Sequence, residues 1–162
     1  MVEVPALLEE IKAETEAERE GVDLTYTWTM QGDLPPLHTD PGKLKIVLKN
    51  LIRNAVKFTE EGSITIEAQG HRGGIEFRVV DTGTGIPAEA LELIFEPFRQ
   101  VGTTSSDQKR GTGLGLHIVK RLLALLGGTI TVESKLGSGS TFRVWVPREH
   151  SISLNVPSDA AL

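Results

Sequence analysis

The 162-residue chain contains no cysteine, which excludes disulfide bonds and thiolate chemistry and fits a reducing compartment. It has no apolar run near the roughly 20 residues that a membrane-spanning helix needs. Its first residues also lack the basic and apolar regions of a secretory signal. The net charge of -5 gives no indication of a nucleic-acid-binding face. We therefore expect a soluble, cytoplasmic chain that contacts neither nucleic acid nor the membrane directly. This expectation also holds for a parent protein that is anchored in a membrane.

Length and composition favour one folded domain, because 39% hydrophobic and 24% charged residues are ordinary for a soluble globular protein. We expect this domain to span residues 22–147 and to be followed by a flexible tail over 148–162. The preceding segment predicts a charged helix over 5–20. Its narrow apolar stripe suits either packing on a neighbour or a continuing coiled coil.

Hydrophobic periodicity predicts the remaining elements. Helices are expected over 41–58, 88–94 and 113–126, with Asp40 as an N-cap and Pro41 at the first position of the longest one. Strands are expected over 23–29, 63–69, 74–80, 128–134 and 140–146. Long helices beside mostly hairpin-linked strands predict an α+β fold: a two-layer α/β sandwich whose mixed, mostly antiparallel sheet packs on three helices.

Three polar side chains form a stripe on the predicted helix 41–58. Asn50, Asn54 and Lys57 lie at positions i, i+4 and i+7, about a quarter turn from the apolar face. Amide oxygens suit Mg²⁺ when phosphates supply most of the charge, and a lysine can contact the same phosphates. The stripe therefore fits a metal-phosphate site, although three exposed polar residues would give the same pattern.

Asp81 ends a predicted strand immediately before a glycine turn. A carboxylate held there can accept a hydrogen bond from an amino group such as that of adenine. Gly83 and Gly85 would let the backbone approach a planar ligand closely. A plain turn with a local aspartate hydrogen bond remains the alternative.

The segment Gly111-Thr112-Gly113-Leu114-Gly115 precedes an apolar helix, and glycines before a helix N-terminus form an anion site. A dinucleotide-binding unit is excluded because no strand precedes the first glycine and the glycine spacing is wrong. The Gly-Lys-Ser/Thr phosphate loop is absent as well.

These segments, in this order, resemble the catalytic ATP-binding domain of sensor histidine kinases, in the superfamily shared with gyrase, Hsp90 and MutL. The resemblance covers residues 23–147, and its fold is the Bergerat-type ATP-binding fold. Residues 50–59 resemble the N box, 81–87 the G1 box, 95–98 the F box and 111–116 the G2 box. Residues 137–142 resemble the closing glycine segment.

The resemblance implies ATP and Mg²⁺ as cofactors. Asn54 would coordinate the metal, and Asn50 and Lys57 would contact phosphates, so these three would be the catalytic residues. Asp81 would bind the adenine amino group, with Thr141 reaching the base through water. An ATP lid would span residues 96–112. The nucleotide-binding set would comprise Asn50, Asn54, Lys57, Phe58, Asp81, Gly83, Gly85, Ile86, Arg99, Lys109, Arg110, Gly111, Thr112, Gly113, Leu114, Gly115, Leu116 and Thr141.

One position favours a kinase over a hydrolase. The ATPase branches carry a glutamate four residues before the metal-binding asparagine, where it acts as a base on water. Asn50 occupies that position here, and an amide cannot take up a proton at neutral pH. The resemblance therefore implies transfer of the γ-phosphoryl group to a histidine.

The acceptor histidine of the family lies on a separate dimerisation domain. None of His38, His71, His117 and His150 precedes a glutamate, as the family motif requires, although His117 could lie near the phosphates. We therefore expect residues 1–21 to be a helix or linker from a missing dimerisation domain, and the chain alone to be inactive in autophosphorylation. A response regulator receiver domain is the expected further partner. A nucleotide-binding interaction module and a Ser/Thr kinase of the same fold are the alternatives.

Overall fold

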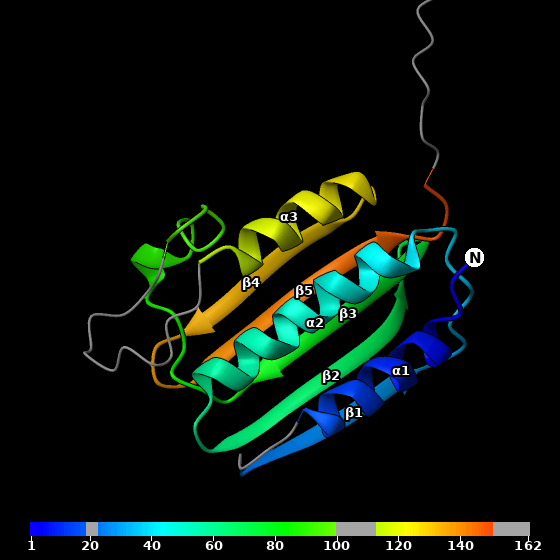
Figure 1. Ribbon diagram of the computed structural model, residues 1–162. Helices are drawn as coiled ribbons and strands as arrows, with labels where there is room; N and C mark the ends of the chain where they lie inside the picture. Colours follow the sequence, from blue (N-terminus) through cyan, green and yellow to red (C-terminus); the bar gives the residue numbers. More distant parts are fainter. Residues whose placement is uncertain (19–22, 100–112, 151–162) are drawn as a thin grey trace, which may run out of the picture.

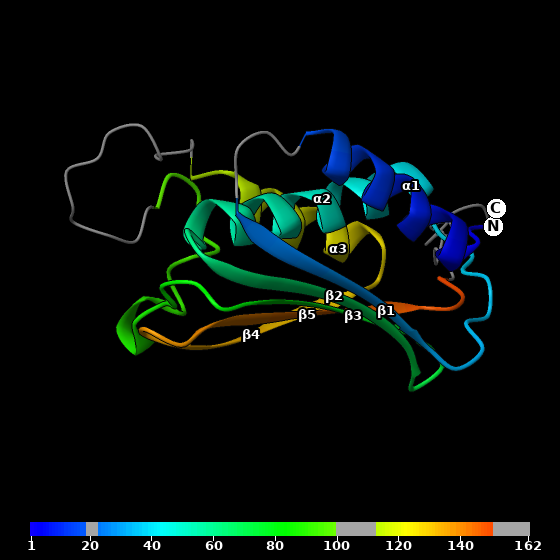
Figure 2. The same cartoon turned by 90° about the horizontal axis from the view of Figure 1, so that it is seen from below.

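The computed structural model describes residues 1–18, 23–99 and 113–150. Within these ranges the chain forms a five-stranded sheet with its helices on one face, seen edge-on in Figure 2. In chain order (Figure 1) the elements are α1 (Val4–Ala17), β1 (Leu24–Gln31), α2 (Pro41–Phe58), β2 (Gly62–His71), β3 (Gly74–Asp81), a 3₁₀ turn (Ala88–Ala90), α3 (Gly115–Leu125), β4 (Thr129–Lys135) and β5 (Gly139–Pro147).

The strands lie in the order β1-β2-β3-β5-β4. The β1–β2 pair is parallel, because α2 connects the two strands, and the other three pairs are antiparallel. The register places Asp81 of β3 opposite Ser140 of β5. The predicted two-layer sandwich with a mixed, mostly antiparallel sheet is therefore confirmed.

Helix α2 lies between α1 and α3 in the helical layer (Figure 1). Its sequence has both a start signal and an apolar face. The Asp40 side chain accepts a hydrogen bond from the Lys43 backbone N–H at 3.0 Å, and Pro41 occupies the first turn. The buried side of the helix packs on the sheet and consists of Leu44, Val47, Leu48, Leu51, Ile52 and Ala55. The predicted bounds of this helix agree with the structure.

The N-terminal helix α1 packs on α2 within the same core. Its apolar stripe comprises Val4, Leu7, Leu8 and Ile11, all buried. The backbone of Val2 also pairs with that of Leu37. Of the two environments that suited the stripe, the structure shows packing on a neighbouring helix. No helix in the described ranges is long and apolar enough to cross a membrane.

Two predicted helices differ from the structure. The expected helix over 88–94 is only the 3₁₀ turn Ala88–Ala90 followed by turns, and Ile94 is the one buried apolar residue between Ala88 and Ile94. Because its other apolar residues are not buried against the core, the segment has no packed face to stabilise a longer helix. Helix α3 begins at Gly115, not at 113, because Gly113 has a φ of 71° and is not helical. Residues 100–112 of the predicted lid lie outside the described ranges.

Candidate functional site

Asn50, the first residue of the polar stripe of α2, faces the start of α3. The Asn50 amide nitrogen donates to the Ile46 carbonyl at 2.9 Å, which leaves its oxygen directed elsewhere. A Cβ atom at Gly115 would lie 3.3 Å from that oxygen, so the first residue of α3 adjoins Asn50. Asn54 and Lys57 are both half-buried, and burial lowers the pKa of Lys57. Asn50 thus borders the junction of α2 with α3, and Lys57 lines a second cavity together with Thr15 of α1 and Tyr26 of β1.

The glycine turn after β3 packs on the end of α2. The Thr84 backbone N–H donates to the Phe58 carbonyl at 3.1 Å. A Cβ atom at Gly83 would lie 2.2 Å from the same carbonyl oxygen, a distance no side chain can adopt. Glycine at this position therefore joins the Asp81 turn to the polar end of α2.

Asp81 is the last residue of β3, directly before this glycine turn, and its side chain is only 6% exposed. Its Oδ1 accepts the Gly83 backbone N–H at 2.9 Å, so the local turn bond anticipated as the alternative is present. Burial raises the pKa of Asp81, while hydrogen bonds from the backbone of Gly83 and Ser140 act in the opposite direction. The turn bond fixes one carboxylate oxygen, so it orients the group and does not exclude a ligand at the second oxygen.

The β4–β5 hairpin closes the site from the other side. The Gly137 backbone N–H donates to the Thr84 carbonyl at 2.7 Å, and the Ile86 backbone N–H donates to the Ser134 hydroxyl at 2.7 Å. Gly85 has a φ of 70° and its Cβ position would lie 2.1 Å from the Lys135 carbonyl oxygen. The turn that carries Asp81 is consequently held between α2 and this hairpin.

The structure does not place Thr141 beside Asp81. Successive side chains of a strand point to opposite faces, and Thr141 pairs with Val80 whereas Ser140 pairs with Asp81. Ser140 is buried with Asp81 on the face that packs on the helices, while Thr141 is half-buried on the other face. The expected water-mediated role of Thr141, which lines the same cavity as Asp81, stays a prediction, and the structure adds Ser140 as the residue paired with Asp81. Counting back in twos from the apolar Phe142 would have found it.

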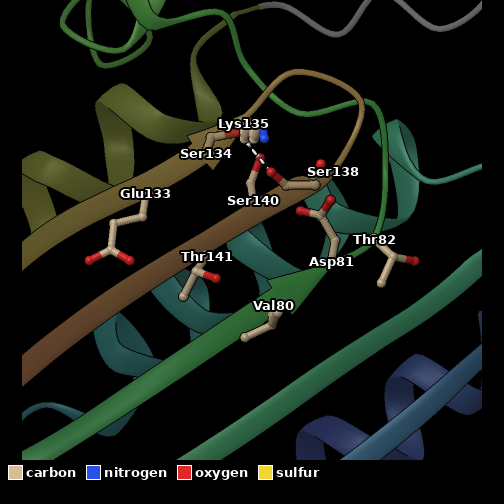
Figure 3. A pocket seen from close by; sticks show the side chains of 10 residues that line it. Val80, Asp81, Thr82, Glu133, Ser134, Lys135, Ser138, Ser140 and Thr141 are labelled. Carbon is tan, nitrogen blue, oxygen red and sulfur yellow. Dashed lines mark hydrogen bonds between the residues drawn. The ribbon is translucent and has the colours of Figure 1, made fainter.

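A cavity of about 360 Å³ lies at the end of the sheet, where Figure 3 shows Asp81, Ser134, Ser138 and Ser140 grouped near the hairpin. Its lining in the described ranges includes no side chain of α2. Thr59, the C-cap residue of α2, lies next to Asp81. Its hydroxyl is buried and, among the described residues, has no hydrogen-bond partner. A Cβ atom at Gly83 would lie 2.7 Å from this hydroxyl oxygen and 2.9 Å from Asp81 Oδ1.

Phe98 and Gly113 join the two ends of the segment that lies outside the described ranges. The Phe98 backbone N–H donates to the Gly113 carbonyl at 3.1 Å, and both residues have positive φ. The Arg99 guanidinium is paired with Glu96 at 2.9 Å, and His117 Nδ1 lies 3.3 Å from the Phe95 carbonyl.

Four expected site residues lie outside the described ranges: Lys109, Arg110, Gly111 and Thr112. Two others are described at the start of α3. Leu114 is its N-cap residue, and the partly buried Leu116 packs on the core.

Residues 39–150 match the family model described as histidine kinase-, DNA gyrase B- and HSP90-like ATPase. The chain belongs to this ATPase family. The match begins just before α2 and ends after β5, so it contains every element that borders the site. The resemblance drawn from the sequence motifs is confirmed.

Among curated relatives, the sensor histidine kinase RcsC of Escherichia coli (strain K12) is 42% identical over 119 residues, which cover 73% of this chain and 12% of RcsC. The chain thus spans about an eighth of that relative. Two solved structures are similar as well. Full-length ShkA in complex with AMPPNP has a TM-score of 0.76 and 36% identity over 90% of this chain and 30% of ShkA. The catalytic domain of histidine kinase ThkA has a TM-score of 0.74 and 30% identity over 89% of this chain and 91% of that domain.

Proposed function

We propose that this chain binds Mg·ATP and transfers its γ-phosphoryl group to a histidine on a separate dimerisation domain of the same parent protein. A receiver domain would take the phosphoryl group in the next step. The observation that carries the proposal is that α2 contacts both other segments, the Asp81 turn at Phe58 and the start of α3 at Asn50. ATP binding is further supported by the ATPase family and by the similar ShkA structure, which contains AMPPNP.

Asp81 would accept the adenine amino group with its second carboxylate oxygen, and Gly83 and Gly85 would leave room for the base. The buried Thr59 hydroxyl fits a polar ligand or water next to Asp81. The phosphates would lie between α2 and the N-terminus of α3, whose N–H groups and positive dipole end suit anions.

Asn54 would hold Mg²⁺. Among the described residues, no cluster of three or more His, Cys, Asp or Glu side chains could bind a metal ion. A single amide oxygen suits a Mg²⁺ ion that obtains its other ligands from phosphates and water. The ion would neutralise charge on the transferred group, while Asn50 and Lys57 position the phosphates.

Asn50 favours transfer over hydrolysis. Its amide donates to the Ile46 carbonyl and cannot act as a base on water. Phosphoryl transfer depends mainly on positioning and on charge neutralisation, which the junction of α2 and α3 can supply without a protein base.

The test is to mix the chain with a separately prepared acceptor domain of the parent protein and γ-labelled ATP. Acid-labile, base-stable label on the acceptor is expected, together with strong loss of labelling for Asp81→Asn because its carboxamide presents one acceptor oxygen and no charge. Ser63→Ala on β2 serves as the matched control. Tight ATP binding without transfer would favour an interaction module, and acid-stable label would favour a Ser/Thr kinase.

A further inference from the structure

The Ser134 hydroxyl of β4 joins three parts of the site. It accepts the Ile86 backbone N–H at 2.7 Å, and it donates to the Gly139 carbonyl at 2.9 Å. Its oxygen also lies 2.8 Å from the hydroxyl oxygen of Ser140, drawn as a dashed line in Figure 3. One side chain therefore connects the Asp81 turn, the hairpin and the residue opposite Asp81.

The proton count at Ser134 determines how Ser140 is oriented. A hydroxyl has one proton to donate and two lone pairs to accept with. When Ser134 donates this proton to the Gly139 carbonyl at 2.9 Å, it has none left for Ser140, although either hydroxyl of the Ser134–Ser140 pair could otherwise be the donor. The remaining Ser134 lone pair then accepts the proton of Ser140. As a result, Ser140 presents only lone pairs to the cavity, beside the acidic carboxylate of Asp81.

Two adjacent acceptors select for a ligand group that donates hydrogen bonds. Ser140 lies opposite Asp81 in the register of β3 and β5, and both residues line the same cavity, so one ligand group can contact both of them. An exocyclic amino group has two protons and can donate toward both acceptors, directly or through water. A 6-oxo group has none, and it would face two acceptors in a buried site, which is unfavourable.

We propose that Ser134 is a positioning residue that sets the preference for adenine over 6-oxopurine nucleotides by orienting the Ser140 hydroxyl. The proposal rests on the proposed ATP-binding function and extends it to a residue outside the sequence motifs. Ser134 acts through Ser140 and Ile86 and does not itself contact the base.

The experiment measures dissociation constants for ATP and for ITP, with Mg²⁺ present, on the intact chain and on five variants. Ser134→Ala removes the network, and Ser134→Thr keeps a hydroxyl on a residue well suited to a strand. Ser140→Ala and the double variant Ser134→Ala/Ser140→Ala form a thermodynamic cycle. Ser63→Ala is the control, because no side-chain hydrogen bond of Ser63 is found in the described part of the chain.

Ser134→Ala should weaken ATP binding about five- to tenfold, the effect of one hydrogen bond, and ITP binding less than about twofold. Ser134→Thr should restore the ATP preference, and the double variant should bind ATP no more weakly than Ser140→Ala. Equal losses for ATP and ITP, or additive losses in the cycle, would show a merely structural role and overturn the proposal.

Two further outcomes separate this proposal from the function on which it rests. If Ser134→Ala does not fold, Ser140→Ala must still reduce the ATP preference, and an unchanged preference refutes the proposal. If the unaltered chain binds neither nucleotide, the proposed function fails and the positioning role fails with it. If it binds ATP tightly but does not discriminate against ITP, only the positioning role fails.

Discussion

At the scale of single residues, the site uses side chains that each have an ordinary structural explanation. Asp81 makes a local turn bond, and Asn50 bonds its own helix. In both cases the local bond uses one polar atom and orients the other. Tertiary packing brings these residues together, because Gly83 and Gly115 place the backbone of two other segments against α2.

Asn54→Ala should weaken Mg²⁺-dependent ATP binding about tenfold or more and leave metal-free binding nearly unchanged. The reason is that a metal-binding amide contributes only when the ion is present, whereas a purely structural residue affects both states. Calorimetric titration of ATP with Mg²⁺ and with a chelator measures the difference. Equal losses under the two conditions would contradict the assignment of the metal to Asn54.

At the scale of elements, α1 and α2 are joined by a ladder of charges as well as by apolar packing. Acidic residues of α1 and its C-cap, at spacing i, i+4 and i+8, face basic residues of α2 at the same spacing. The pairs are Glu10 with Lys45, Glu14 with Lys45 and Lys49, and Glu18 with Lys49 and Arg53. Hydrogen bonds from Lys45 and Lys49 lower the pKa of Glu14 to about 2.

Glu14→Gln should therefore reduce stability in a pH-dependent way. The folded-state pKa of Glu14 lies below its ordinary value of 4.5, so its contribution is present above pH 4.5 and is lost as the pH falls toward 2. Urea unfolding should show a gap between the unaltered chain and the variant at pH 7 that narrows on acidification and with added salt.

Glu16→Gln is the control for this prediction, because no ion pair of Glu16 is found in the described ranges. A gap that stays constant from pH 7 to pH 3, or one equal to that of the control, would show that the ladder does not stabilise the packing of α1.

At the scale of the whole molecule, one core extends from α1 to β5. Ile11 of α1 and Val144 of β5 are both fully buried members of it. The loop between β1 and α2 is also joined to the segment after β5, because the His38 backbone N–H donates to the Arg148 carbonyl at 2.8 Å. The division into a linker over 1–21, a domain over 22–147 and a tail over 148–162 stays a prediction.

Ile11→Ala tests whether α1 belongs to the cooperative unit. The truncation of a fully buried isoleucine should lower the free energy of unfolding by about 2–5 kcal/mol, in a single transition. The exposed neighbour Glu9→Ala is the control and should change it by less than about 0.5 kcal/mol. A loss no larger than that of the control would identify α1 as a linker that is dispensable for folding.

Much of the fold was predictable because it depends on local signals. The bounds of α2 follow from its cap, its proline and its apolar period, and the hairpins follow from their glycine turns. The predicted helix over 88–94 was wrong because nearby packing decides whether such a short segment is helical. The role given to Thr141 stays a prediction, whereas the pairing of Ser140 with Asp81 was missed because motif position alone does not reveal the face of a strand on which a side chain lies.

The sequence by itself determined the family, the order of the elements and the residue types of the proposed nucleotide site. These properties reside in short segments whose composition is readable without their neighbours. Only the tertiary structure decided which side chains meet: Ser140 with Asp81, Ser134 with Ile86, and Asn50 with Gly115. These contacts join residues that lie 48 to 65 positions apart in the sequence, and close packing of that kind depends on the whole core.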